Sequence, residues 1–311
     1  AVTGITEATT QALYALDTIS LTDSLKLNLG LRYDWYKTSS KTVATGAVLS
    51  LKDQFLNYQA GLVFKPTQNS SFYASYAKST TPVGSLIGEG QEGNALTNTA
   101  LITLNDLKAE KTSSYEVGTK WEFFDAALAL NLALFRTETI NARTTSSTGV
   151  LEYVGERRID GFEVGFNGKI LPFWNIFGGY TYMDSEIRNA GVGNASNGRA
   201  FPNTPKHSFT AWSTVDIADR FQIGGGAIYN SKQYGGYTAN ALGTIVRSIP
   251  SYWRFDATAS MDITDNIALR VNVQNLTNKR YYDRTYTTHF VAIAPGRSAF
   301  ASAMRRATRD D

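Results

Sequence analysis

The side chains able to do chemistry are few, and they do not form a recognisable catalytic or metal-binding pattern. The chain has no cysteine, and its two histidines, His207 and His289, are 82 positions apart. A zinc site needs a compact set of Cys and His ligands, so we expect no metal centre. A Ser-His-Asp triad could be assembled on paper, but no nucleophile-elbow sequence supports it. The sequence therefore predicts that the chain is no enzyme and has no resident cofactor.

Composition and charge exclude further classes of protein. The 311 residues include 30 basic and 27 acidic side chains, a balance too even for a nucleic-acid-binding surface. No run approaches the roughly 18 apolar residues of a transmembrane helix. The start, Ala1-Val2-Thr3-Gly4, has neither the charged head nor the apolar core of a signal peptide. We expect either a cytosolic protein or a chain that lacks its beginning, and no nucleic-acid partner.

Apolar and polar residues alternate with period two over long segments. In 25–35, leucines and aromatic residues occupy every odd position, and polar residues or glycine occupy the even ones. The same alternation fills 252–262 and 267–274, which a Thr264-Asp265-Asn266 turn joins. Successive side chains of a strand point to opposite faces. Each segment is therefore predicted to be a strand with one apolar face and one polar face.

The full pattern predicts 13 strands, whose connections alternate strictly between short and long. The short connections are 22–24, 66–70, 124–125, 171–173, 218–220 and 264–266. Long antiparallel strands with short turns at one end and long loops at the other are typical of outer-membrane β-barrels, where the turns are periplasmic and the loops extracellular. A soluble β-sandwich is the alternative, but its strands would be about half as long, near ~5–6 residues.

Aromatic residues near the predicted strand ends favour the barrel. The chain has 17 Tyr, 16 Phe and 5 Trp, and amphipathic rings prefer the membrane–water interface. The rings expected there are Trp35, Tyr36, Tyr73, Tyr76, Trp121, Phe173, Trp174, Tyr180, Tyr182, Tyr229, Tyr252 and Trp253. The run Gly224-Gly225-Gly226 falls inside a strand, so it predicts a bend or a close approach in the wall and not a phosphate loop.

The strand count is odd, and the predicted first and last strands run in the same direction. A complete bacterial barrel has an even number of strands and both ends in the periplasm. In this chain the N-terminus would lie on the extracellular side. We therefore expect the chain to be the C-terminal part of a larger barrel.

Four stretches resemble the barrel of TonB-dependent outer-membrane siderophore receptors. Residues 107–118 resemble that family's "L-K-P-E-x-x-x-x-Y-E-x-G", with Ala109 in place of proline. Residues 153–163 are similar to its "V-G-E…G-x-E", 275–281 to "N-L-x-N-x-x-Y", and 295–297 to "P-G-R". The motif positions are Tyr115, Glu116, Gly118, Gly155, Glu156, Gly161, Glu163, Asn275, Leu276, Asn278, Tyr281, Pro295, Gly296 and Arg297.

The resemblance implies a 22-stranded transmembrane antiparallel β-barrel with an N-terminal plug in its lumen. About 13 of those strands would be present, with residues 1–305 as the C-terminal barrel portion and the plug domain missing. Residues 306–311 form a polar tail where the family usually ends on an aromatic residue. The implied function is uptake of a ferric siderophore, driven by TonB through the plug. The implied surroundings are outer-membrane lipid and lipopolysaccharide, and 288–298 is most similar to the catecholate branch.

A ferric catecholate is anionic and aromatic, so its binding surface needs Arg for charge and aromatic rings for stacking. The candidates in the expected extracellular loops are Tyr234, Tyr237, Arg247, Arg284, Tyr286 and His289, with Arg280, Tyr281 and Tyr282 nearby. The alternative for each of them is a role at the membrane interface or on lipopolysaccharide phosphates. Arg297 is expected to fix the start of the last strand and not to contact ligand.

Two further expectations concern the polar face and the transported substance. Polar side chains that point into the barrel are expected to pair with one another or to face the plug; they are Arg32, Asp34, Lys120, Glu122, Arg254, Asp256 and Arg270. Two other functions stay open at the level of sequence. One is a passive porin-like channel, and the other is a TonB-dependent receptor for another nutrient, such as a vitamin or a saccharide.

Overall fold

The structure is a computed structural model, and it describes residues 4–83, 108–145, 151–240, 243–286 and 290–305. Every secondary-structure element in these ranges is a β-strand, as expected for an all-β chain. No helix in these ranges is long and apolar enough to cross a membrane. The expected tail at 306–311 lies outside the described residues.

Thirteen of the described strands form one antiparallel sheet, which confirms the predicted number. In sheet order they are β1 (Gly4–Ser20), β2 (Leu25–Thr42), β3 (Val48–Thr67), β4 (Ser70–Thr81), β5 (Glu110–Phe123), β6 (Leu128–Thr145), β7 (Leu151–Leu171), β8 (Trp174–Asn189), β9 (His207–Ala218), β10 (Phe221–Asn230), β13 (Tyr252–Thr264), β14 (Ile267–Gln274) and β17 (Ser298–Arg305).

Two more hairpins lie in segments that the sequence analysis treated as loops. They are β11 (Gln233–Asn240) with β12 (Gly243–Ile249), and β15 (Tyr282–Tyr286) with β16 (Phe290–Ile293). Their strands have only four to eight residues. Although β11 is as long as the correctly predicted β14, none of the four strands carries a sustained alternation of apolar and polar residues, so the sequence did not reveal them.

The register brings apolar positions of neighbouring strands opposite one another across the whole sheet. Leu31 of β2 lies opposite Tyr58 of β3, Leu134 of β6 lies opposite Phe162 of β7, and Tyr229 of β10 lies opposite Trp253 of β13. We name this side the apolar face and the other side the polar face. Large side chains on the apolar face are exposed, among them Leu134 at 61%. A continuous apolar surface of this size needs lipid against it.

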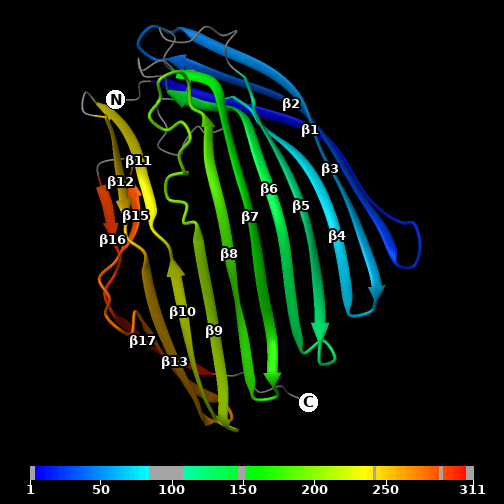
Figure 1. Ribbon diagram of the computed structural model, residues 1–311, viewed down its shortest axis with the longest axis vertical. Coiled ribbons are helices and arrows are strands. Elements are labelled where there is room, and N and C mark those ends of the chain that lie inside the picture. Colours follow the sequence, from blue (N-terminus) through cyan, green and yellow to red (C-terminus); the bar gives the residue numbers. More distant parts are fainter. Residues whose placement is uncertain (1–3, 84–107, 146–150, 241–242, 287–289, 306–311) are drawn as a thin grey trace.

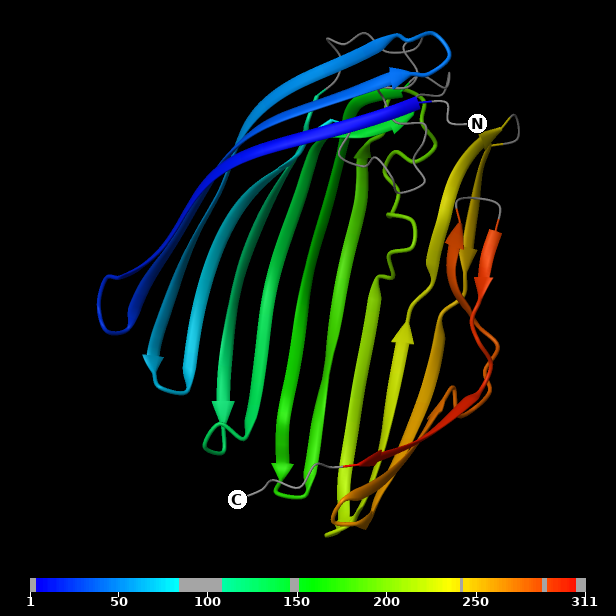
Figure 2. The same cartoon turned by 180° about the vertical axis from the view of Figure 1, so that it is seen from behind.

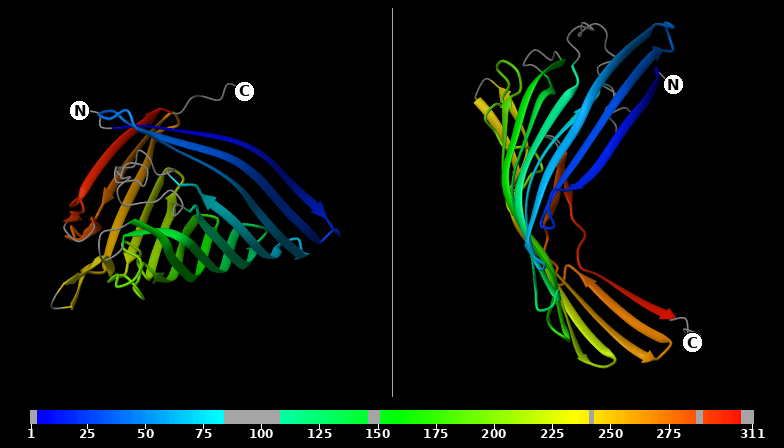
Figure 3. Two further views of the ribbon diagram at one scale, coloured as in Figure 1. Left: turned by 90° about the horizontal axis from the view of Figure 1, so that it is seen from above. Right: turned by 90° about the vertical axis from the view of Figure 1, so that its right-hand side faces the viewer.

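The sheet is a curved, open wall of long strands that lie side by side (Figures 1 and 3). Its edges are β1 and β17, and in the described residues β1 pairs with β2 alone and β17 with β14 alone. Strand β1 begins at the end with the long loops, and β17 runs toward the end with the short turns (Figure 2). This confirms the expected strand directions, whereas the total of 22 strands stays a prediction.

Four of the expected interfacial rings belong to a band on the apolar face, on the side of the long loops. The ring centroids of Tyr76 lie 5.8 Å from Tyr58 and 4.9 Å from Tyr115, and those of Tyr229 and Trp253 lie 4.8 Å apart. We name the band the outer girdle; its members are Tyr58, Tyr76, Tyr115, Phe162, Tyr182, Tyr229 and Trp253. These contacts support the predicted membrane interface.

Three of the expected interfacial rings lie on the polar face instead. Tyr36 follows Trp35 of the apolar face and is 5% exposed, and the Tyr73 hydroxyl donates to Glu116 at 2.6 Å. The Tyr252 ring stacks on Tyr281 at 4.3 Å. A position near a strand end indicates how far a ring lies from the membrane centre, but only the strand register determines which face of the sheet it occupies. The sequence prediction did not apply the register to these three rings.

The glycine run in β10 sits where strands approach closely, as predicted. A Cβ at Gly226 would lie 2.2 Å from Cε3 of Trp212 on the neighbouring strand, whereas one at Gly225 would meet only the Asp256 carbonyl oxygen at 3.5 Å. The indole of Trp212 therefore occupies the space of the missing side chain. Glycine at this position is required by a cross-strand aromatic ring.

Candidate ligand-binding surface at the loop end

Three segments from different parts of the chain meet at the long-loop end. They are the β11–β12 hairpin, the β15–β16 hairpin and the loop 190–206 between β8 and β9 (Figures 1 and 2). Strand β15 contacts both β11 and β12, and Pro202 forms a bridge with Tyr234. The segments form one continuous surface above the membrane-spanning wall.

A β-bulge places two tyrosines of β11 side by side. The register shifts between Tyr234 and Gly236, and Gly236 has a φ of 149°, which glycine adopts easily. Without the bulge, residues three apart would point to opposite sides of the strand. With it, the rings of Tyr234 and Tyr237 lie 5.9 Å apart.

Two cations lie over these rings. The Lys232 ammonium is 5.0 Å from the Tyr234 ring centroid, and the Arg199 guanidinium is 5.5 Å from that of Tyr237. The Tyr237 hydroxyl donates to the Ala200 carbonyl at 2.9 Å. Burial raises the pKa of Tyr237, so its hydroxyl remains a donor at neutral pH. The four side chains form a cationic and aromatic patch, which we name the Tyr–cation patch: Arg199, Lys232, Tyr234 and Tyr237.

Asn203 links this patch to the β15–β16 hairpin. Its amide oxygen accepts from the Thr285 backbone N–H at 2.9 Å and from the Thr285 hydroxyl at 2.8 Å. Its amide nitrogen donates to the Thr285 carbonyl at 2.9 Å, and its own backbone N–H donates to the Tyr234 carbonyl at 2.8 Å. Thr285 is only 4% exposed, so these bonds are shielded from water. One side chain thereby joins all three segments.

The structure brings together only some of the predicted ligand residues. Tyr234 and Tyr237 are adjacent, but Arg247 alternates with Val246 and Ser248, the register partners of these tyrosines, and so lies on the other side of the hairpin. Arg284 is exposed on the neighbouring hairpin and pairs with Asp283 at 3.3 Å. Tyr286 ends β15, where the structure describes its backbone, and His289 lies outside the described residues.

The cations of the patch, Arg199 and Lys232, were not predicted. Both are basic residues in long loops, and that was the only signal in the sequence. Nothing in their spacing associates Arg199 with a tyrosine 38 positions further along the chain, because the contact depends on how two separate loops meet.

The "N-L-x-N-x-x-Y" motif forms a hydrogen-bond network at the loop end of β14. Asn275 is 2% exposed and adopts a φ of 51°. Its side chain accepts from the Lys279 N–H at 2.8 Å and donates to the carbonyls of Lys279 and Pro295 at 2.9 and 3.2 Å. Its backbone N–H donates to Asp256 at 2.8 Å. The buried amide therefore ties the end of β14 to the start of β17.

The "P-G-R" motif completes this hydrogen-bond network. The Asn278 side chain accepts from the Arg297 N–H at 2.9 Å, and the Arg297 guanidinium donates to the Leu276 carbonyl at 3.4 Å. A Cβ at Gly296 would lie 3.2 Å from the Asn278 side-chain oxygen, which leaves little room for a larger residue. Tyr281 packs below with Tyr252 and Ala294. These bonds hold Arg297 at the start of β17, and that it does not contact ligand stays a prediction.

Two further motif glycines, Gly118 and Gly161, accommodate aromatic rings on the polar face. A Cβ at Gly118 would lie 2.5 Å from the Tyr73 hydroxyl, which reaches past it to Glu116. A Cβ at Gly161 would lie 2.4 Å from the Phe135 ring. Tyr115 belongs to the outer girdle; Gly155 is buried and Glu156 is exposed, and Glu163 lies opposite Ala133. These motif positions build the wall and are remote from the Tyr–cation patch.

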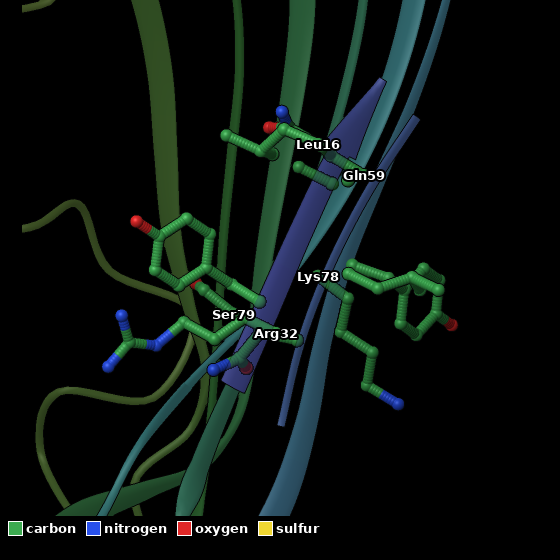
Figure 4. A pocket seen from close by; sticks show the side chains of 11 residues that line it. Leu16, Arg32, Gln59, Lys78 and Ser79 are labelled. Atoms are coloured by element: carbon green, nitrogen blue, oxygen red, sulfur yellow. The ribbon is translucent and has the colours of Figure 1, made fainter. Parts of the chain in front are cut away.

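Polar side chains of the polar face pair as expected at two places. Arg32 binds Asp34 at 2.8 Å, and Arg254 binds Asp256 at 2.7 Å. Near the first pair, a hollow of about 360 Å³ lies beside Leu16 and Gln59, whereas Arg32 and Lys78 extend to opposite sides of the strands (Figure 4). That this face meets a plug stays a prediction.

The long tilted strands, the apolar face with its aromatic girdle and the polar opposite face define the wall of an outer-membrane β-barrel. The chain belongs to the TonB-dependent receptor-like β-barrel family, whose model matches residues 2–276.

Individual relatives agree with this assignment. The chain is 39% identical over 303 residues to the probable TonB-dependent siderophore receptor PiuA of Acinetobacter baumannii, which covers 93% of this chain and 39% of PiuA. It is 31% identical over 297 residues to the catecholate siderophore receptor Fiu of Escherichia coli K12, covering 88% of this chain and 38% of Fiu. The crystal structure of PiuA superposes with a TM-score of 0.85 at 36% identity, over 97% of this chain and 44% of that one. The chain thus spans about two fifths of the length of these curated relatives.

Proposed function

We propose that this chain forms part of a TonB-dependent receptor that takes up a ferric siderophore across the outer membrane, with ferric catecholates as the ligand class. The names of PiuA and Fiu support the siderophore, and that of Fiu supports the catecholate. TonB is the proposed energy-supplying partner, acting through a plug in the lumen. Outer-membrane lipid and lipopolysaccharide are the proposed surroundings of the wall.

The observation that carries the proposal is the Tyr–cation patch. A ferric catecholate carries negative charge and presents flat aromatic rings. Arg199 and Lys232 supply the opposite charge, and the Tyr234 and Tyr237 rings supply surfaces for stacking. The patch lies on the loops, where a ligand arriving from outside would first meet the protein.

Titration of a ligand into the full-length protein encoded by the gene tests this role. The probe is the iron(III) complex of 2,3-dihydroxybenzoate, followed by quenching of tryptophan fluorescence. Loss of a ring or a cation should cost about 1–2 kcal/mol of binding, so Tyr237→Ala or Arg199→Ala should raise Kd about tenfold. Tyr237→Phe keeps the ring and should bind nearly as well as the wild type.

Arg247→Ala is the matched control for Arg199→Ala. It also removes one arginine, but from the side of the β11–β12 hairpin opposite to Tyr234 and Tyr237. Equal weakening by Arg247→Ala and Arg199→Ala would show a general charge effect and would refute a role for the patch. Binding of a neutral saccharide or a vitamin in place of the iron complex would favour a receptor for another nutrient.

A further inference from the structure

Strands β3 and β4 separate on the side of the long loops and leave a hollow between them. Their pairing begins at Tyr58 and Lys78 and continues toward the short turn, whereas residues 48–57 of β3 pair with β2 alone. The hollow measures about 590 Å³ and contains four lysines in its lining, Lys52, Lys78, Lys108 and Lys111. This volume is in the range of ordinary ligand pockets, about 300–1,000 Å³.

Within the described residues, the lining of the hollow has a net positive charge. Among the described residues of its lining, the only carboxylate is Asp53, which accepts the backbone N–H of Gln54 at 2.8 Å. None of the four lysines forms an ion pair within the described residues, where the ion pairs involve arginines and Lys206. Four ammonium groups around one hollow repel one another, and an anion between them would relieve that repulsion.

At the same level of the wall, further along the sheet, basic side chains are neutralised by acidic partners. On β6–β8, Arg158 lies 3.0 Å from Asp160, and Arg188 lies 3.7 Å from Glu186. Lys206 lies 3.0 Å from Asp184. Basic side chains of β7 and β8 at this level therefore have acidic partners, whereas the four lysines at the hollow between β3 and β4 have none among the described residues.

The register places three of the four lysines on the apolar face, just above the outer girdle. Lys78 lies opposite Tyr58, and its ammonium is 5.8 Å from that ring. Lys52 and Lys111 occupy the apolar-face positions of β3 and β5. Long lysine side chains at such a position lie along apolar surface and direct their charge to the headgroup level. Below them the apolar face continues, as acyl chains require.

We propose that this hollow binds the phosphorylated headgroup of an outer-leaflet glycolipid, whose acyl chains lie along the apolar face of β3–β5. The lysines contact the phosphates, and the rings of Tyr58 and Tyr76 lie at the junction between headgroup and chains. The inference depends on the outer-membrane location of the wall and is independent of the ligand at the Tyr–cation patch. It distinguishes one place on the wall from the uniform lipid contact of the remaining strands.

The proposal is tested by native mass spectrometry of the full-length protein encoded by the gene, purified in detergent. The probes are bisphosphorylated lipid A and its monophosphorylated derivative. Each lysine near an anionic lipid surface is worth about a fivefold change in affinity, so the triple variant Lys52→Ala/Lys78→Ala/Lys111→Ala should retain bisphosphorylated lipid A about a hundredfold more weakly. The monophosphorylated lipid should bind more weakly than the bisphosphorylated one to the wild type.

The control is Lys26→Ala/Lys65→Ala/Lys169→Ala, which removes the same charge at the short-turn end and should retain lipid as the wild type does. Both variants must show the heat-dependent gel mobility of a folded barrel; if the triple variant does not, single lysine variants are compared by the same measurement. Equal lipid retention by the two triple variants would refute the proposal. Displacement of the lipid by excess inorganic phosphate would assign the hollow to free phosphate and also refute it. Binding of the iron complex should be equal in both variants, which separates this test from that of the Tyr–cation patch.

Discussion

At the residue scale, Asn275 shows how a short motif acts through geometry and not through ligand contact. The sequence identified the motif, but it did not indicate that this amide satisfies three backbone groups of one loop. The buried position and the φ of 51° explain the choice of residue, because asparagine tolerates the left-handed region and carries both a donor and an acceptor. Such contacts join residues 20 positions apart and follow only from the fold.

Two substitutions separate the contributions of Asn275. Asn275→Gly removes the side-chain hydrogen bonds but accepts the positive φ, and should cost about 2–3 kcal/mol of folding free energy. Asn275→Ala also forces a Cβ into the left-handed region and should cost about 1 kcal/mol more. Urea unfolding in vesicles measures both. An alanine variant as stable as the glycine variant would contradict the assigned backbone strain.

At the element scale, period-two alternation was sufficient to predict the thirteen strands of the wall and their directions. It failed for β11–β12 and β15–β16, which carry no sustained alternation, and it was not used to place Tyr36, Tyr73 and Tyr252 on one side of the sheet. The approach of the loops to one another could not be predicted, because it depends on contacts such as that of Asn203 with Thr285, which no local pattern encodes.

The β10 glycines offer a matched pair of substitutions. Gly226→Ala places a Cβ against the Trp212 ring and should cost about 1–3 kcal/mol, whereas Gly225→Ala meets only an ordinary contact and should be nearly neutral. Combining Gly226→Ala with Trp212→Ala should cost less than the sum of the single changes. Equal stability of the two single glycine variants, measured by the same unfolding assay, would disprove the close approach.

Asn203 should control how rigidly the loops are held. Asn203→Ala removes three bonds to the shielded Thr285 and should destabilise the junction by about 1–3 kcal/mol. Hydrogen exchange at 199–203, β11 and β15 should become faster, with no change in the wall. Thr204→Ala is the control, since among the described residues its hydroxyl bonds only to the nearby Pro202 carbonyl. Unchanged exchange in β15 would show that the loops are held by other contacts.

At the scale of the whole molecule, the two faces of the sheet give the wall its function. The apolar face and its girdle place the strands in the membrane, and this end-to-end orientation puts the Tyr–cation patch outside the cell. The wall was predictable because its chemistry repeats along every strand. The patch was only partly predictable because Arg199 and Lys232 reach the tyrosines through folded loops.

We propose that the protein imports a ferric siderophore with energy from TonB. The most direct measurement is the uptake of radioactive iron, supplied as a ferric catecholate, by cells with and without the gene. We predict that uptake is lost on deletion of the gene, is restored by the gene in trans, and is absent in cells that lack TonB. Uptake that is unchanged by deletion of the gene, or that persists without TonB as in a passive channel, would refute TonB-driven import by this protein.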